Sequence, residues 1–336
     1  MISNQVASIL KLFCRVVLIL AFAFKVEYGA AECLKYGTPT QIGKLKKALD
    51  EVSGIVASRR QPGVFWAHND SLNKFRLHAF RVVSNSVQAL GYFKVSGINL
   101  GVHAMDWEDI AIGPGPTSED WIYIADTGNN FFDRNSGRKR ALRLIRVPEP
   151  RINYNQIKFS DDYEKIGETD KGAAEVLAFS YPNGIEYDSE SIAISKSHNL
   201  LYLVTKGTQD DTGADVFEFS LRDSHWISLK NYDIDLPRKM SPRFVMRVRD
   251  VETVTGMDIA ADETMLVLRD KSRLYPYRKT AVEPFSHFWL HPLNSVKMDE
   301  EKGEAVAFDG KNKTLFSSSE DSRQVFEVPC LLSQDH

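Results

Sequence analysis

Three glutamates hold equivalent positions in separate parts of the chain. Glu108, Glu190 and Glu304 each lie two residues before an isoleucine or valine that belongs to a short apolar run, and Asp106 and Asp188 stand two residues before the first two glutamates. Carboxylates that are brought together repel one another unless a proton or a cation neutralises them. Carboxylate oxygens are also the ligands that Ca²⁺ prefers. These residues therefore predict a calcium site, provided that the fold brings them to one place.

Further polar residues follow a second apolar run in each repeat. The candidate ligand-binding residues among them are Asn69, Asp70, Asp126, Lys206 and Asp270, and Glu320 is a sixth candidate metal ligand. Arg134 lies in the long polar segment 128–140, whose basic side chains can pair with phosphate or carboxylate. Two other interpretations stay open. In the first, the carboxylates bind no cation and are instead solvated or bound to backbone amides. In the second, the basic segment is a solvated loop without a ligand.

The elements that must position these residues are short strands. Runs rich in aromatic and β-branched residues alternate with turn residues, and no long helical period appears. The innermost runs are anchored at Ile55, Ile110, Ile192, Ile259 and Val306. Repeated units of four strands are typical of propeller blades. We therefore predict an all-β fold, a five-bladed β-propeller, and six blades remain the alternative.

Four of the repeats contain a further apolar run that we expect to form the outer strand. These runs lie near residues 88–95, 174–180, 227–234 and 286–291. Residues 150–172 form a polar insert rather than another set of strands. The last repeat lacks an outer strand, which residues 41–47 can supply from the start of the chain. This closure removes an open sheet edge and brings the two chain ends together.

The N-terminus has the features of a secretory signal peptide. Lys11 and Arg15 precede a short apolar run at 16–24, and small residues follow at 29–31. We expect residues 1–31 to be removed and residues 32–336 to form a single secreted propeller domain, with an uncleaved anchor as the alternative. The net charge of −3 argues against a nucleic-acid partner. No membrane partner is expected after cleavage.

Two cysteines remain after removal of the signal peptide. Cys33 and Cys330 lie near opposite ends of the mature chain. Two cysteines in an oxidising compartment usually pair, and closure of the ring would bring these two together, so we predict a disulfide. Asn312 begins an Asn-Lys-Thr sequence in an expected turn, which predicts glycosylation there.

Several motifs resemble a family of secreted, largely uncharacterised β-propeller proteins. They are Glu51-Val52-Ser53-Gly54, Trp66-Ala67-His68-Asn69-Asp70-Ser71, Asp106-Trp107-Glu108-Asp109-Ile110-Ala111, Val204-Thr205-Lys206, Val254-Thr255-Gly256 and Gly303-Glu304-Ala305-Val306-Ala307-Phe308. The last motif, together with Ser319-Glu320, is also similar to motifs of calcium-dependent propeller phytases. This second resemblance implies a calcium-dependent hydrolase.

Two classes of function follow. The first is a calcium-binding or ligand-binding module that holds a small molecule or a protein at one end of the central channel, here called the channel mouth. The second is a calcium-dependent hydrolase of a phosphoester, ester or lactone, in which the metal activates water. No nucleophile elbow, phosphate-binding loop or dinucleotide fingerprint is present, so no catalytic residue is assigned.

Overall fold

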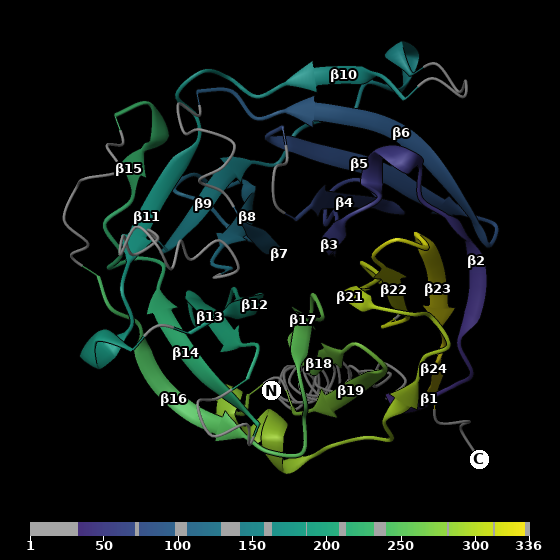
Figure 1. Ribbon diagram of the computed structural model, residues 1–336, viewed down its shortest axis with the longest axis vertical. Coiled ribbons are helices and arrows are strands. Elements are labelled where there is room, and N and C mark those ends of the chain that lie inside the picture. The colour runs from purple at the N-terminus through teal and green to yellow at the C-terminus, as the bar shows by residue number, and fades with distance from the viewer. Residues whose placement is uncertain are drawn as a thin grey trace, which may run out of the picture. The chain divides into compact units, whose positions relative to one another are not determined.

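The predicted runs form strands because aromatic and β-branched side chains suit a pleated, half-buried surface. The computed structural model describes residues 33–70, 74–97, 106–128, 142–157, 163–185, 187–207, 213–231, 240–280, 282–311 and 313–332. Within Lys35–Leu331, five sheets of four or five strands are arranged around a centre (Figure 1). All helices in the described residues are short 3-10 helices. The prediction of a five-bladed β-propeller is confirmed.

Each blade places one strand nearest the centre. In blades 1 to 5 these innermost strands are β3 (Val52–Ala57), β7 (Trp107–Pro114), β12 (Ser189–Ser195), β17 (Val254–Ile259) and β21 (Gly303–Phe308). Each contacts the next, and β21 contacts β3, so the ring is closed. Their antiparallel partners are β4 (Val64–Asn69), β8 (Asp120–Asp126), β13 (Leu200–Thr205), β18 (Met265–Asp270) and β22 (Leu315–Ser319).

The third and outer strands complete the blades. The third strands are β5 (Arg76–Val83), β9 (Leu142–Pro148), β14 (Ala214–Ser220), β19 (Arg273–Arg278) and β23 (Gln324–Val328). The outer strands are β6 (Ser86–Lys94), β11 (Glu175–Phe179), β16 (Arg243–Val248), β20 (Val296–Lys297) and β2 (Thr40–Lys44). The predicted strand from the start of the chain is thus β2, which pairs antiparallel with β23 and completes blade 5.

Two of the predicted outer strands are wrong. Ile227 and Ser228 form β15, which pairs with β11 of blade 2, and the outer strand of blade 3 is β16. The second error concerns Phe285–Leu290, which form the 3-10 helix η6 and not a strand of blade 4. Phe285 and Phe288 are both buried, and a spacing of three residues places them on one side of a 3-10 turn. Their hydrophobicity reflects packing beneath the helix and not strand pairing.

The polar insert also contributes a strand. Residues Lys165–Glu168 form β10, which pairs parallel with β6 on the outside of blade 1. Tyr163 reaches inward beside this strand, where its ring stacks on His78 at 5.4 Å between centroids. The insert of one repeat therefore covers the edge of the preceding blade, which would otherwise present unpaired backbone groups.

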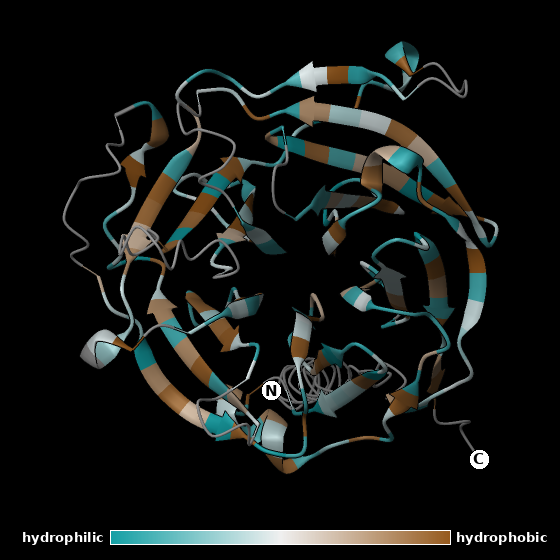
Figure 2. Ribbon diagram, in the orientation of Figure 1, coloured by the Kyte–Doolittle hydropathy of each residue, from teal (hydrophilic) through white to brown (hydrophobic). Residues whose placement is uncertain are grey.

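The core lies between neighbouring blades. Every residue of β3 and β12 is buried because both faces of an innermost strand are covered by the adjacent blades. In Figure 2, hydrophobic residues are interspersed with hydrophilic ones along the outer strands, which pack against the core on one face only. Large aromatic side chains such as Trp66 and Trp107 fill the space between blades 1 and 2.

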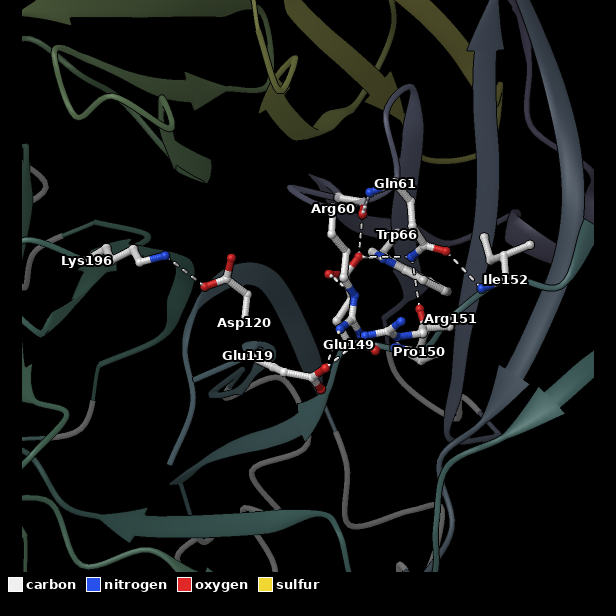
Figure 3. Close-up of polar contacts among 11 residues, drawn as sticks. Arg60, Gln61, Trp66, Glu119, Asp120, Glu149, Pro150, Arg151, Ile152 and Lys196 are labelled. Carbon is white, nitrogen blue, oxygen red and sulfur yellow. Dashed lines mark hydrogen bonds and ion pairs between the residues drawn. The ribbon is translucent and has the colours of Figure 1, made fainter. Parts of the chain in front are cut away.

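A buried polar cluster also joins blades 1 and 2 (Figure 3). Glu149, directly after β9, is 2 % exposed. It accepts hydrogen bonds from Trp66 Nε1 at 3.0 Å, from Gln61 Nε2 at 3.2 Å and from the Ser58 hydroxyl. Arg60 Nε lies 3.1 Å from Glu149 Oε2. This carboxylate is matched by donors from the turn that follows β3, and it lies at the end of the strands opposite to the channel mouth.

The two described cysteines are both disulfide-bonded, as predicted for Cys33 and Cys330. They lie in β1 (Cys33–Tyr36) and β24 (Cys330–Leu332), which pair with each other. The predicted signal peptide lies outside the described residues. No helix among the described residues is both long and apolar enough to cross a membrane.

Candidate cation-binding site at the channel mouth

Every innermost strand has a β-bulge near its start, and in four of the five blades the bulged residue lines the channel mouth. In β7, Trp107 pairs with Asp126 and Asp109 with Ala125, so Glu108 has no partner in the ladder. The same register shift occurs in the other four innermost strands. The bulged residues are Ser53, Glu108, Glu190, Thr255 and Glu304. Bulges commonly redirect a side chain in this way beside functional sites.

The bulged residues without a carboxylate join the blades together. Ser53 donates a hydrogen bond to the backbone oxygen of Glu108 at 2.6 Å, and Thr255 donates one to the backbone oxygen of Gly303 at 3.0 Å. In blades 1 and 4 the bulge is therefore satisfied within the protein, whereas blades 2, 3 and 5 each present a glutamate.

The carboxylates converge on a cavity of about 170 Å³. Its lining residues are Glu51, Val52, Ser53, Asp70, Glu108, Glu190, Lys206, Lys271, Glu304 and Glu320. Ligand oxygens lie within 4.8 Å of one another in two groups that share Glu108. The first group, here called the outer carboxylate group, is Asp70, Asp106 and Glu108; the second, the inner carboxylate group, is Glu108, Asp188 and Glu190.

Glu108 belongs to both groups and is buried. It is 3 % exposed, and its Oε1 has no hydrogen-bond partner among the described residues. Burial, followed by the charges of Asp70, Asp106 and Asp188, raises the pKa of Glu108 well above its ordinary value. A Cβ on Gly128 would lie 1.7 Å from Oε1, so a larger residue at this position would displace the carboxylate. The geometry provides a confined oxygen that needs either a proton or a cation.

Glu190 is neutralised within the protein. Lys206 Nζ forms an ion pair with Glu190 and lies 3.8 Å from Asp188 Oδ2. On the far side of the mouth, burial and the charge of Glu320 raise the pKa of Glu304 to about 7. Glu320 itself lies 3.8 Å from Lys302 Nζ. The three glutamates thus share one cavity but differ in how their charge is balanced.

Three of the predicted ligand-binding residues have structural partners and do not line this cavity. Asp126 is fully buried, is 2.6 Å from Arg143 Nη2 and accepts a hydrogen bond from the backbone of Asp106. Asp270 accepts hydrogen bonds from the turn after β18, at Ser272 and Arg273. The remaining residue, Asn69, donates to the backbone oxygen of Ala48 at 3.1 Å. The predicted residues Arg134 and Asn312 lie outside the described residues.

The alignment of the repeats explains two of these differences. The strand registers make Asn69, Asp126, Thr205, Asp270 and Ser319 equivalent. The next residue in each blade is Asp70, Thr127, Lys206, Lys271 and Glu320, and four of these five line the cavity. Asp126 and Asp270 were therefore one residue early, and successive residues of a strand point to opposite faces.

Lys271 and Thr255 are the residues that the sequence interpretation missed. The innermost strand of blade 4 was anchored on Ile259, but the register makes Met257 equivalent to Ile110. Alignment of the Val-Thr-Lys sequence at the end of one strand with the Leu-Arg-Asp-Lys sequence at the end of another makes Lys271 equivalent to Lys206.

No family model matches the chain, and no curated protein matches it. Among solved structures it is similar to Raptor from Chaetomium thermophilum, with 8% sequence identity and a TM-score of 0.45. The match covers 89% of this chain and 30% of that chain, so the protein spans about a third of the length of that structure.

Proposed function

We propose that the protein is a secreted binding module whose channel mouth holds a divalent cation, Ca²⁺, on the outer carboxylate group of Asp70, Asp106 and Glu108. The observation that carries this proposal is the buried Oε1 of Glu108, which has no hydrogen-bond partner among the described residues and belongs to a side chain that lines the cavity. An unpaired buried carboxylate is costly, and a cation removes that cost. Hard carboxylate oxygens favour Ca²⁺ over soft metals.

A cation at this place stabilises the ring. Asp70 follows β4 of blade 1, whereas Asp106 and Glu108 belong to the start of blade 2. An ion shared by these side chains links the two blades and leaves its outward side for a small molecule or a protein. The disulfide supports a location outside the cell, because disulfides persist in oxidising compartments.

Thermal unfolding with calcium and with chelator tests this proposal. An ion that binds only the folded protein, at 100 times its Kd, stabilises it by about 2.7 kcal/mol. We expect the parent protein to melt at a higher temperature in calcium, and Glu108→Gln to lose that difference. Glu119→Gln is the matched control, since Glu119 lies at the other end of the strands and pairs with Arg60 and Arg151. Equal melting of the parent protein in calcium and chelator would refute the proposal.

A calcium-dependent hydrolase of a phosphoester, ester or lactone is a second candidate, which the resemblance to propeller phytases also suggests. It is favoured by one observation: a Glu304 pKa of about 7 lets this carboxylate accept a proton near neutral pH within the same cavity as the cation site. Turnover assays on the three substrate classes decide between the two functions. The hydrolase requires turnover that Glu304→Gln abolishes, while the binding module shows none.

A further inference from the structure

Lys206 occupies a fixed place between two blades. Its backbone N–H donates to the oxygen of Asp188 at 2.8 Å, and its own backbone oxygen accepts from Val254 of blade 4 at 2.9 Å. These bonds hold the residue directly after β13, so that the side chain extends into the channel mouth. Blades 3 and 4 therefore fix the backbone of Lys206, and its side chain reaches the carboxylates from there.

The ammonium group lies against carboxylates whose spacing would suit a metal ion. The inner carboxylate group, Glu108, Asp188 and Glu190, has oxygens within 4.8 Å of one another. Lys206 Nζ is paired with Glu190 and lies 3.8 Å from Asp188. Its charge also acts on Glu108 and on Glu304, where it opposes the rise of both pKa values. One lysine thus faces carboxylates from three blades.

We propose that Lys206 is a built-in cation that fills the inner carboxylate group, limits the channel mouth to one divalent ion, and leaves a second divalent-ion site when it is removed. An ammonium group supplies one charge and three donors, whereas a bound Ca²⁺ supplies two charges and requires several oxygens. The two cations cannot share the inner group, because both need Glu190. The ion in the outer carboxylate group is part of the proposed function, on which this inference rests to that extent. The second ion, in the inner carboxylate group of a variant without Lys206, does not depend on it.

Calcium stoichiometry tests the inference. Equilibrium dialysis with calcium as the only added metal compares the folded parent protein with Lys206→Met, which keeps an unbranched side chain one atom shorter and removes the charge. We expect Lys206→Met to bind one more Ca²⁺ per chain than the parent protein. The double variant Lys206→Met with Glu190→Gln should lose that additional ion. An unchanged stoichiometry in Lys206→Met overturns the inference.

Two further variants separate place from charge. Lys271→Met removes the same charge from the same cavity, but no ion pair of Lys271 with a carboxylate is present among the described residues. If Lys271→Met also gained an ion, total charge and not the place of Lys206 would be responsible, and the inference would fail. Lys196→Met, which removes an exposed pair with Asp120 away from the cavity, is the control for the substitution itself.

The parent background supplies an independent test that does not need Lys206→Met to fold. If Lys206 holds Glu190, then Glu190→Gln leaves the number of bound ions unchanged, whereas Glu108→Gln reduces it by one. Loss of an ion in Glu190→Gln would make Glu190 a ligand of the native ion and contradict the inference. The proposed function fails separately: a parent protein without calcium, together with a Lys206→Met variant that binds one ion, refutes the first site and supports the role of Lys206.

Discussion

Two buried glutamates at opposite ends of the same blades are balanced in different ways. Glu149 is 2 % exposed and is surrounded by donors from Ser58, Gln61 and Trp66, with Arg60 as its ion-pair partner. Glu108 is 3 % exposed, and its Oε1 has no hydrogen-bond partner among the described residues. The first carboxylate is part of the protein's own structure. Glu149 Oε2 also has no hydrogen-bond partner among the described residues, but the Arg60 guanidinium lies 3.1 Å from it, whereas Glu108 has no ion pair in the described part of the chain. A buried carboxylate without such compensation is the arrangement expected of a group that binds a cation or a proton.

Figure 3 makes the first half of this comparison visible, with Arg60, Gln61 and Trp66 turned towards Glu149. A buried carboxylate that is matched by several donors cannot be replaced without leaving those donors unpaired. A carboxylate that lacks donors can be replaced by a neutral side chain with little loss of folding stability. The same substitution at the two positions should therefore have opposite effects on stability.

The largest effect is expected from Glu149→Gln. The amide places an N–H₂ group among donors and removes the ion pair with Arg60, and breaking a buried pair typically costs about 3–5 kcal/mol. We expect a loss of this size in the free energy of unfolding, measured by urea denaturation, with or without calcium. A loss below about 1 kcal/mol would mean that water or a neighbouring group replaces the carboxylate.

Glu108→Gln should have the opposite sign when calcium is absent. Burial raises the pKa of Glu108, so the folded parent protein loses stability as the pH rises above the ordinary glutamate range. The variant carries no charge to bury, and we expect it to be more stable than the parent protein by about 1–2 kcal/mol at pH 8 in chelator. At pH 4 the two proteins should unfold at similar denaturant concentrations. If Glu108→Gln were less stable than the parent protein at pH 8, the Glu108 carboxylate would have to be compensated by donors, as that of Glu149 is.

Glu304 gives an intermediate case. Its pKa of about 7 lies above the ordinary value of 4.5, so its contribution to stability is complete below about pH 4.5 and is lost as the pH rises through about 7. The slope is at most about 1.4 kcal/mol per pH unit. Melting of the parent protein and of Glu304→Gln between pH 4 and pH 8 measures it. If the melting temperatures of the two proteins changed with pH in parallel, burial of the Glu304 charge would not contribute to the pH dependence.

The smallest effect on stability is expected for a charged group that is exposed to solvent. Lys196 and Asp120 form an exposed pair at 3.4 Å, and such pairs contribute about 0–1 kcal/mol. Lys196→Met should change the free energy of unfolding by no more than this, and added salt should reduce the difference further. A larger effect would mean that charge at this end of the blades contributes to stability without burial, and the contrast with Glu108 would be weaker.

Much of the fold was accessible from the sequence because each blade repeats local patterns. The runs at Ile55, Ile110, Ile192 and Val306 mark four innermost strands, and the missing strand of the last repeat pointed to residues 41–47. The outer strands of blades 3 and 4 were not accessible in this way. Short apolar runs do not reveal whether they pair within their own blade, pair with another blade as β15 does, or form a 3-10 helix as Phe285–Leu290 do.

The sequence by itself determined that three glutamates face the channel mouth, because Glu108, Glu190 and Glu304 keep the same offset from their strands. Only the tertiary structure decided what each of them does. Successive residues of a strand point to opposite faces, so Asp126 and Asp270, which pair with Trp107 and Val254, lie away from the cavity, while Lys271, the residue after Asp270, lines it. The pairing of Lys206 with Glu190, and the lack of a partner for Glu108 Oε1 in the described residues, follow from how neighbouring blades pack.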